Sequence, residues 1–264
     1  MIRKLLIACV AVFTAMHTVS SQKMISPQTH GWIMYFGNHK INDRWGLHTE
    51  YQWRRAGRDE SANIFQDWQQ SLLRIGVDYY AKNQTQWTAG YGWIKTFEYG
   101  DQPVSHSFNE HRIWEQFIVK NKLGRVDIQH RYRLEQRFVE QYKLGTSGVY
   151  EQNGYAFRNR IRYRFMVTLP LTRKEMKDNT LFLSIYDEPF LGFGKGIGKN
   201  ILDQNRLYGA LGWRFTKDFN VQLGYLNQYV VKSDGIKAER NHTLQLAMIY
   251  NFNFNFSKTS INSY

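Results

Sequence analysis

Cysteine, long apolar runs and metal-binding spacings are all scarce in this sequence. Cys9 is the only cysteine in 264 residues, which excludes internal disulfides and cysteine-based metal sites. Only 42% of the residues are hydrophobic, so the chain does not encode a bundle of membrane-spanning helices. The 8 histidines show no HExxH or similar spacing, and no aspartate-rich calcium loop occurs. We therefore expect neither a metal nor a cofactor.

The first 21 residues have the features of a secretory signal peptide. Arg3 and Lys4 precede the apolar run Leu5–Phe13, and small residues lead to an expected cleavage after Ser21. The apolar run is too short for a helical membrane anchor. Cys9 lies in a stretch that resembles a lipoprotein cleavage box, but apolar sequence continues after it. The expected organisation is a signal peptide over 1–21 and a single domain over 22–264.

The formal net charge of +13 falls by two when Arg3 and Lys4 are removed with the signal peptide. In an exported protein, a basic balance favours anionic lipid or an anionic solute as the partner. Nucleic acid is disfavoured, because the arginines are spread through the predicted strands and no recognition module accompanies them.

Apolar and polar residues alternate along the chain from about residue 30 to 256. Near the C-terminus, for example, Leu244, Leu246 and Met248 alternate with Gln245 and Ala247, and the alternation continues to Phe256. A period of two predicts β-strands. The segments are 29–37, 44–55, 68–81, 86–98, 108–120, 125–141, 154–169, 179–188, 202–215, 219–231 and 240–256. No amphipathic helix separates them, so we expect an antiparallel meander.

Segment length and connections favour a membrane barrel. Most segments are longer than the usual five to six residues of soluble strands and reach the roughly 9–11 needed to cross a bilayer. Short and long connections alternate, and tryptophans such as Trp45, Trp87 and Trp213 stand near strand ends. We expect an all-β fold, an antiparallel transmembrane β-barrel of about 12 strands (range 10–14) in the outer membrane, with short periplasmic turns and longer extracellular loops. The alternative is a secreted soluble β protein, whose strands would alternate as well.

The strand count conflicts with this expectation. Eleven strands close a barrel through a parallel pair, whereas bacterial single-chain barrels have an even number. Either residues 22–30 supply a twelfth strand, despite Pro27, or the first segment lies in the lumen as a plug.

Two segments, EHRIWEQ (110–116) and HRYRLEQRF (130–138), resemble a family of Gram-negative outer-membrane barrels called domain of unknown function 2490. GWIMYFG (31–37) and LLRIGVDYY (72–80) extend the resemblance over essentially the whole mature chain. It implies the fold and the location, and it implies no activity. The last segment, with Ala247, Tyr250 and Phe252, is also similar to the signal read by the barrel-assembly machinery, a partner that this implies during biogenesis.

Arginine occupies every second position of FRNRIRYRFMV (157–167), between apolar residues. In a barrel, Phe157, Ile161, Tyr163 and Phe165 would face lipid and the arginines would face the lumen. The same alternation predicts lumenal Arg54, Arg74, Arg112, Arg131, Arg133, Arg137, Arg158, Arg160, Arg162, Arg164, Arg206 and Arg214. The predicted lumenal acids are Glu50, Asp78, Glu98, Glu110, Asp127, Glu135 and Glu188.

An excess of lumenal arginine predicts a porin-like conduit for small anionic solutes, because rings of Arg or Lys select anions in pores. The alternative is a filled barrel, a structural or partner-binding protein in which arginines and acids pair as a rigid core. A tight hairpin at NKLG (121–124) predicts a register in which paired residue numbers sum to 245. Arg112 then lies opposite Arg133, and Glu110 opposite Glu135. Glu115 lies opposite His130 on the outer face, where such a pair could contact a partner.

A third possibility is an outer-membrane lipid hydrolase or acyltransferase with a site at the rim. His106 and His111 lie beside serines and a glutamate at a loop–strand junction. Nucleophile and base are recognised by geometry and not by adjacency in sequence, so both histidines are weak candidates.

Overall fold

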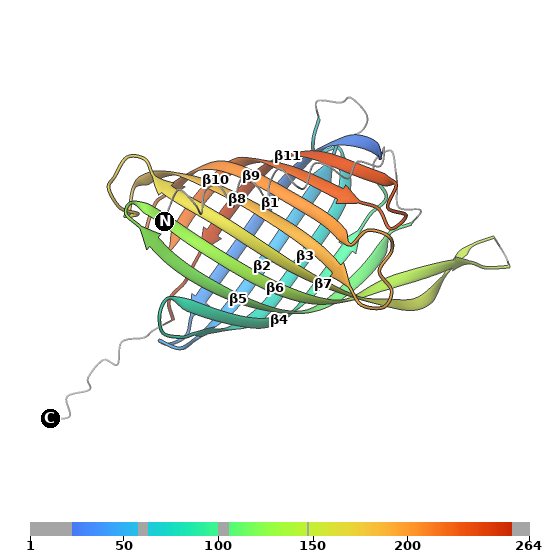
Figure 1. The fold of residues 1–264 in the computed structure, drawn as a ribbon, viewed down its shortest axis with the longest axis horizontal. Coiled ribbons are helices and arrows are strands. Elements are labelled where there is room, and N and C mark those ends of the chain that lie inside the picture. The colour runs from blue at the N-terminus through green and yellow to red at the C-terminus, as the bar shows by residue number, and fades with distance from the viewer. Residues whose placement is uncertain (1–22, 58–62, 100–105, 147, 255–264) are drawn as a thin grey trace, which may run out of the picture.

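The computed structural model describes residues 23–57, 63–99, 106–146 and 148–254, which form one closed barrel (Figure 1). The predicted signal peptide lies outside the described residues. No described segment forms a helix long and apolar enough to cross a membrane. The strands are β1 (Met24–Lys40), β2 (Trp45–Ala56), β3 (Asp67–Tyr80), β4 (Thr85–Thr96), β5 (Phe108–Leu123), β6 (Val126–Leu144), β7 (Tyr150–Pro170), β8 (Thr180–Phe193), β9 (Leu202–Arg214), β10 (Phe219–Val231) and β11 (Lys237–Tyr250).

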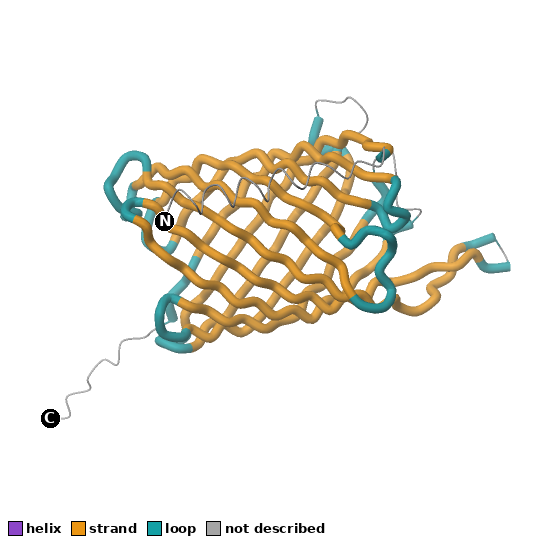
Figure 2. The backbone as a smooth tube through the Cα atoms, in the orientation of Figure 1, coloured by secondary structure: helices purple, strands orange, loops and turns teal. Residues whose placement is uncertain are grey.

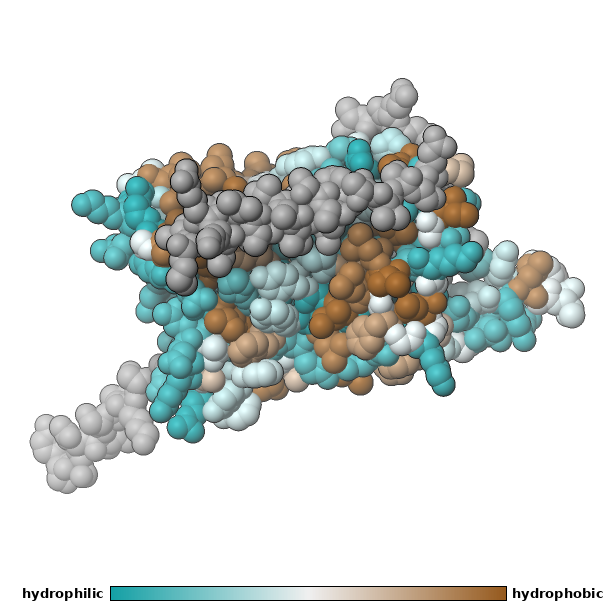
Figure 3. All heavy atoms as spheres, viewed as in Figure 1, coloured by the Kyte–Doolittle hydropathy of each residue, from teal (hydrophilic) through white to brown (hydrophobic). Residues whose placement is uncertain are grey.

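The alternation of the sequence becomes a barrel with a polar inside and an apolar outside. In β3, Leu73, Ile75 and Val77 are exposed on the outer wall, whereas Arg74 and Asp78 are buried inside. Figure 3 shows brown apolar side chains along the wall and many of the teal hydrophilic ones at the two ends. Because successive side chains of a strand point to opposite faces, one strand can supply both surfaces.

The barrel closes through a parallel pair between its first and last strands. All other neighbours are antiparallel, but β1 and β11 run parallel from Met24↔Lys237 to Phe36↔Ile249. The expectation of an entirely antiparallel sheet is thus wrong at one seam. Both explanations offered for the odd count are also wrong, since residues from Met24 onwards continue into β1 and form part of the wall. Pro27 is tolerated because β1 pairs with β2 only from His30 onwards, which leaves Pro27 beside a single neighbour.

The parallel seam predicts a specific cross-link. Ile33 and Leu246 are direct partners across it and both side chains point outward, so Ile33→Cys with Leu246→Cys should form a disulfide on oxidation. The cross-linked barrel should migrate differently from the reduced one on a denaturing gel. Ile33→Cys with Tyr250→Cys, about 13 Å out of register, is the matched control. Equal cross-linking of both pairs would contradict the eleven-strand closure.

The two ends of the barrel differ in their connections, as the sequence predicts. One end carries 41–44, 81–84, 124–125, 171–179 and 215–218, of which 171–179 is the longest. The other end carries 57–66, 97–107, 145–149, 194–201 and 232–236. At this second end β6 and β7 extend past their neighbours as a two-stranded projection, clear in Figure 2.

The predicted pairing of β5 with β6 is wrong by four residues, although the predicted faces are right. Leu123 pairs with Val126, so the turn consists of Gly124 and Arg125 and not of the residues before them. Gly124 has a φ of +59°, which glycine adopts without strain at the first position of a two-residue hairpin. Paired numbers therefore sum to 249, and the partner of Trp114 is Glu135.

The C-terminal alternation also continues past the end of its strand. β11 ends at Tyr250, and Phe252 and Phe254 lie outside it. Phe252 N donates to His39 Nδ1 at 3.1 Å, and Phe254 N donates to the carbonyl of Lys40 at 2.7 Å. These residues thus pack beside the end of β1.

The arginine-lined lumen as candidate functional site

Charged residues from most strands converge inside the barrel. Of the twelve arginines predicted there, all but Arg158 line one cavity of about 620 Å³. Among the predicted acids, Glu50, Glu110, Asp127 and Glu188 line the same cavity. Glu135 and Asp78 are buried without lining it. The prediction that Glu98 faces the lumen is wrong, because Glu98 follows the end of β4 and is exposed.

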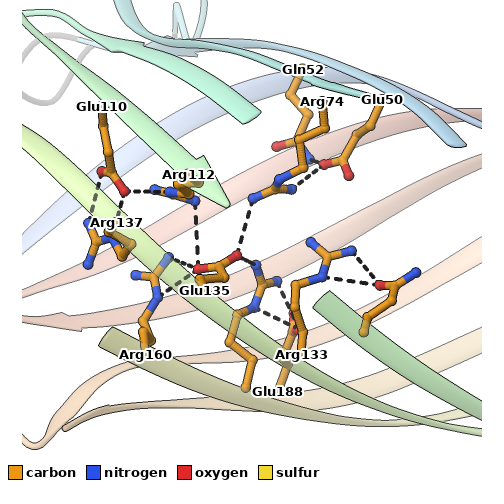
Figure 4. A network of polar contacts seen from close by, with 12 residues as sticks. Glu50, Gln52, Arg74, Glu110, Arg112, Arg133, Glu135, Arg137, Arg160 and Glu188 are labelled. Atoms are coloured by element: carbon orange, nitrogen blue, oxygen red, sulfur yellow. Dashed lines mark hydrogen bonds and ion pairs between the residues drawn. The ribbon is translucent and has the colours of Figure 1, made fainter. Parts of the chain in front are cut away.

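Glu135 is the centre of this site, with none of its side chain exposed. Its Oε2 lies 2.6 Å from Nη2 of Arg160 and 3.8 Å from Nη1 of Arg112. Its Oε1 lies 2.8 Å from Nη1 of Arg162 and 3.4 Å from Nη2 of Arg74. Arg74 comes from β3 and reaches across the lumen to β6, as Figure 4 shows. Four guanidinium groups therefore surround one carboxylate.

Further carboxylates extend the network around Glu135. Glu188 accepts from Arg131 at 2.5 Å and from Arg162 at 2.8 Å. The remaining ion pairs join Glu110 to Arg112 and Arg137, Glu50 to Arg74, and Asp203 to Arg137 and Arg160. The network thus ties β2, β3 and β5–β9 together. Buried charges that are paired in this way hold their strands in one arrangement, since breaking one pair leaves its partner uncompensated.

Asp203 and Glu239 are lumenal acids that sequence reasoning missed. Alternation from Arg206 would place Asp203 on the outer face. A β-bulge, marked by the register shift at Phe190/Leu191, turns it inward instead. Glu239 is buried and receives Lys232, but the predicted last segment begins only at residue 240. The alternation of polar and apolar residues does not reveal a bulge, so Asp203 could not be assigned to the lumen from it. Glu239 would have been assigned to the lumen if the predicted last segment had begun before residue 240.

The wall opposite the ion pairs is built from amides and aromatic rings. Buried amides on β9, β10 and β11 include Gln204, Gln228, Asn241 and Gln245. Trp32, Met34, Tyr186, Tyr208 and Leu226 pack together as an apolar cluster beside them. The lumen therefore has a charged side and a side lined mainly by uncharged groups, called the neutral side below, on which Arg206 and the Glu239–Lys232 pair are the charged exceptions among the described residues.

Apart from Arg214, which donates to backbone carbonyls at one end of the barrel, four cavity-lining arginines form no ion pair with a carboxylate of the described residues: Arg54, Arg133, Arg164 and Arg206. Neutral amides and rings hold them instead. Arg133 donates to Gln116 and lies over the ring of Trp114 at 4.7 Å. Arg164 donates to Gln129 and lies over Tyr186 at 5.4 Å. All four line the cavity, so their positive charge is available to a solute.

Trp114 fills the lumen beside a pair of small residues. Gly76 and Gly90 are direct partners on β3 and β4, and the Trp114 ring lies against them. A side-chain carbon at Gly90 would stand 2.8 Å from this ring, so only glycine accommodates the indole there. His48 contacts the ring edge-on at 5.1 Å.

Glu115 and His130 do not lie opposite each other, which corrects the register predicted for them. Glu115 lies opposite Leu134, and His130 opposite Val119. Glu115 is exposed on the outer wall and accepts a weak hydrogen bond from Gln136 Nε2 at 3.4 Å. His130 Nδ1 lies 2.8 Å from the Tyr163 hydroxyl. A role for either residue in binding a partner stays a prediction.

The two candidate catalytic histidines contact tyrosines. His111 is on the outer wall, where its Nδ1 lies 2.5 Å from the Tyr91 hydroxyl. The ring of His106 lies 3.8 Å from that of Tyr150 and 5.2 Å from that of Tyr142. A catalytic role for them stays a prediction that these contacts do not favour.

Comparison with known proteins gives one match. The model of a family described as "Protein of unknown function (DUF2490)" matches residues 29–240. No curated protein and no solved structure matches the chain.

Proposed function

The chain belongs to the DUF2490 family of proteins of unknown function, and we propose that it is an outer-membrane barrel whose lumen passes small anionic solutes. In this proposal residues 1–21 direct export, and the short connections face the periplasm. The apolar outer wall and the closed ladder support membrane insertion, because a closed barrel leaves no backbone group unpaired in lipid. Outer-membrane lipid and, during biogenesis, the barrel-assembly machinery are the partners this implies.

The observation that carries the proposal is the set of lumenal arginines without carboxylate partners among the described residues. Arg54, Arg133, Arg164 and Arg206 line the same cavity, whose lining extends from Asn121 near the short connections to Gln69 and Tyr99 near the long ones. Basic groups that line a pore attract anions and repel cations. The charge pattern therefore favours passage of anions.

Conductance in a planar bilayer tests this proposal. We expect the refolded protein to give discrete current steps, and a salt gradient to give a reversal potential that favours anions. Arg133→Gln with Arg164→Gln should reduce that preference, because both guanidinium groups are held by neutral amides and form no ion pair with an acid of the described residues. Arg44→Gln with Lys82→Gln, at two exposed turns, is the control with the same charge change. Silence from folded protein, or unchanged selectivity in the double variant, would contradict the conduit.

A filled barrel without conductance is the second candidate, and the network around Glu135 favours it. This carboxylate and its four guanidinium partners cross the lumen from β3 to β6 and β7. A solute would have to pass beside this network along the neutral wall. The same bilayer experiment separates the two candidates.

A further inference from the structure

Two buried guanidinium groups lie over one indole ring at the neutral side of the lumen. Arg54 of β2 is 4.1 Å and Arg206 of β9 is 5.3 Å from the ring centre of Trp32 on β1. Arg206 also lies 5.0 Å from Phe190. The arginines are 6% and 8% exposed, so both charges are largely removed from water.

Neither arginine forms an ion pair with a carboxylate of the described residues, and the acids nearest to them are paired with other arginines. The acid nearest Arg54 along its strand, Glu50, is held by Arg74. Glu188, directly across from Arg206, is held by Arg131 and Arg162. Burying two cations with no carboxylate in direct contact with either is unfavourable. A bound anion would supply the missing charge.

Both arginines keep N–H groups for such an anion. Arg54 donates to the amide oxygens of Gln52 and Gln70. Arg206 donates through Nε and Nη2 to Gln204, when that amide is oriented to satisfy its neighbours. A guanidinium has five N–H donors, and its fork matches a carboxylate or phosphate. The remaining donors of the pair can therefore bind an oxyanion.

A run of amides leads away from Arg206 along the wall. The same Gln204 oxygen accepts from Gln228 Nε2 at 2.7 Å, and Asn241 Nδ2 donates to Gln228 at 3.3 Å. The oxygen of Asn241 is buried and has no hydrogen-bond partner among the described residues. Amides both donate and accept, which suits hydroxyl groups. The cavity volume, about 620 Å³, is in the range of small-molecule sites.

We propose that Arg54 and Arg206 form a binding site for an oxyanion carried on a hydroxylated body, the chemistry of a sugar acid or sugar phosphate. The guanidinium groups hold the anionic group, and Gln228 and Asn241 contact the hydroxyls. This site deepens the proposed function and rests on it for the route by which the solute arrives. Binding itself requires no conductance.

The test is calorimetric titration of the refolded protein in detergent micelles with glucuronate, inorganic phosphate and glucose. We expect glucuronate to bind more tightly than either of the other two. Arg54→Gln with Arg206→Gln should weaken glucuronate binding at least about tenfold, since each arginine contributes a charge-assisted contact. Arg214→Gln removes one charge at the other end of the lumen and should leave binding unchanged.

Should the double variant fail to fold, Arg206→Lys keeps the charge and removes the fork, and it should still weaken binding severalfold. Glucose binding equal to that of glucuronate, phosphate binding as tight as glucuronate, or full affinity in the folded double variant would overturn the site. Glucuronate binding by a silent barrel would support the site and contradict the conduit alone. Anion conductance without glucuronate binding would support the conduit and contradict the site.

Discussion

Glu135→Gln is expected to lower the free energy of unfolding by about 3–5 kcal/mol, the range observed when one partner of a buried ion pair is removed. Glu135 is fully buried and is contacted by four arginines from three strands. Glutamine retains the shape but loses the charge, so these guanidinium groups would repel one another in the barrel interior. Each of the four arginines keeps a second carboxylate, which limits the loss: Glu50 for Arg74, Glu110 for Arg112, Asp203 for Arg160 and Glu188 for Arg162.

Urea unfolding of the micelle-bound protein, followed by circular dichroism, measures this effect. Glu98→Gln removes the same charge from an exposed position and should leave the midpoint unchanged. Arg160→Gln removes one of the four arginines and should cost less than Glu135→Gln, because three remain. A midpoint for Glu135→Gln within error of the control would show that the network does not hold the strands together.

The sequence was sufficient to predict the faces of the strands. Alternation is local, and burial enforces it, since a slip of one residue would turn every lumenal side chain into the wall. In β7 the even-numbered Arg160 and Arg162 are buried, whereas the odd-numbered Phe157 and Ile161 are exposed, as the alternation predicts. Trp114 lies in the lumen by the same alternation, at an even position of β5 with Arg112.

Register and partners could not be predicted, because they depend on single turns and on distant residues. A left-handed glycine at Gly124 moved the β5–β6 pairing by four residues. The contact between Arg74 and Glu135 joins positions 61 residues apart and across the lumen. Pairing of β1 with β11 depends on closure of the whole sheet, which no local pattern encodes. These contacts are set by the closed barrel.

Removal of the Trp114 indole is expected to open the lumen. None of the side chain is exposed, and it fills space between the Gly76–Gly90 pair and the guanidinium of Arg133. Trp114→Ala should cost about 3–5 kcal/mol of stability, the usual effect of deleting a large buried aromatic side chain. The glycines opposite cannot fill the gap, because they have no side chains. If the lumen conducts, single-channel conductance should rise severalfold.

Bilayer recordings and urea unfolding on the same preparation separate these two effects. Trp87→Ala removes an indole from the outer wall and should change neither conductance nor anion preference. Trp114→Phe retains a ring against Gly90 and should fall between the wild type and Trp114→Ala. Because the Arg133 guanidinium lies over the indole, loss of the indole should also free this guanidinium. Anion preference should then increase together with conductance. Unchanged conductance in folded Trp114→Ala would place the narrowest point elsewhere, at the ion pairs of Glu135.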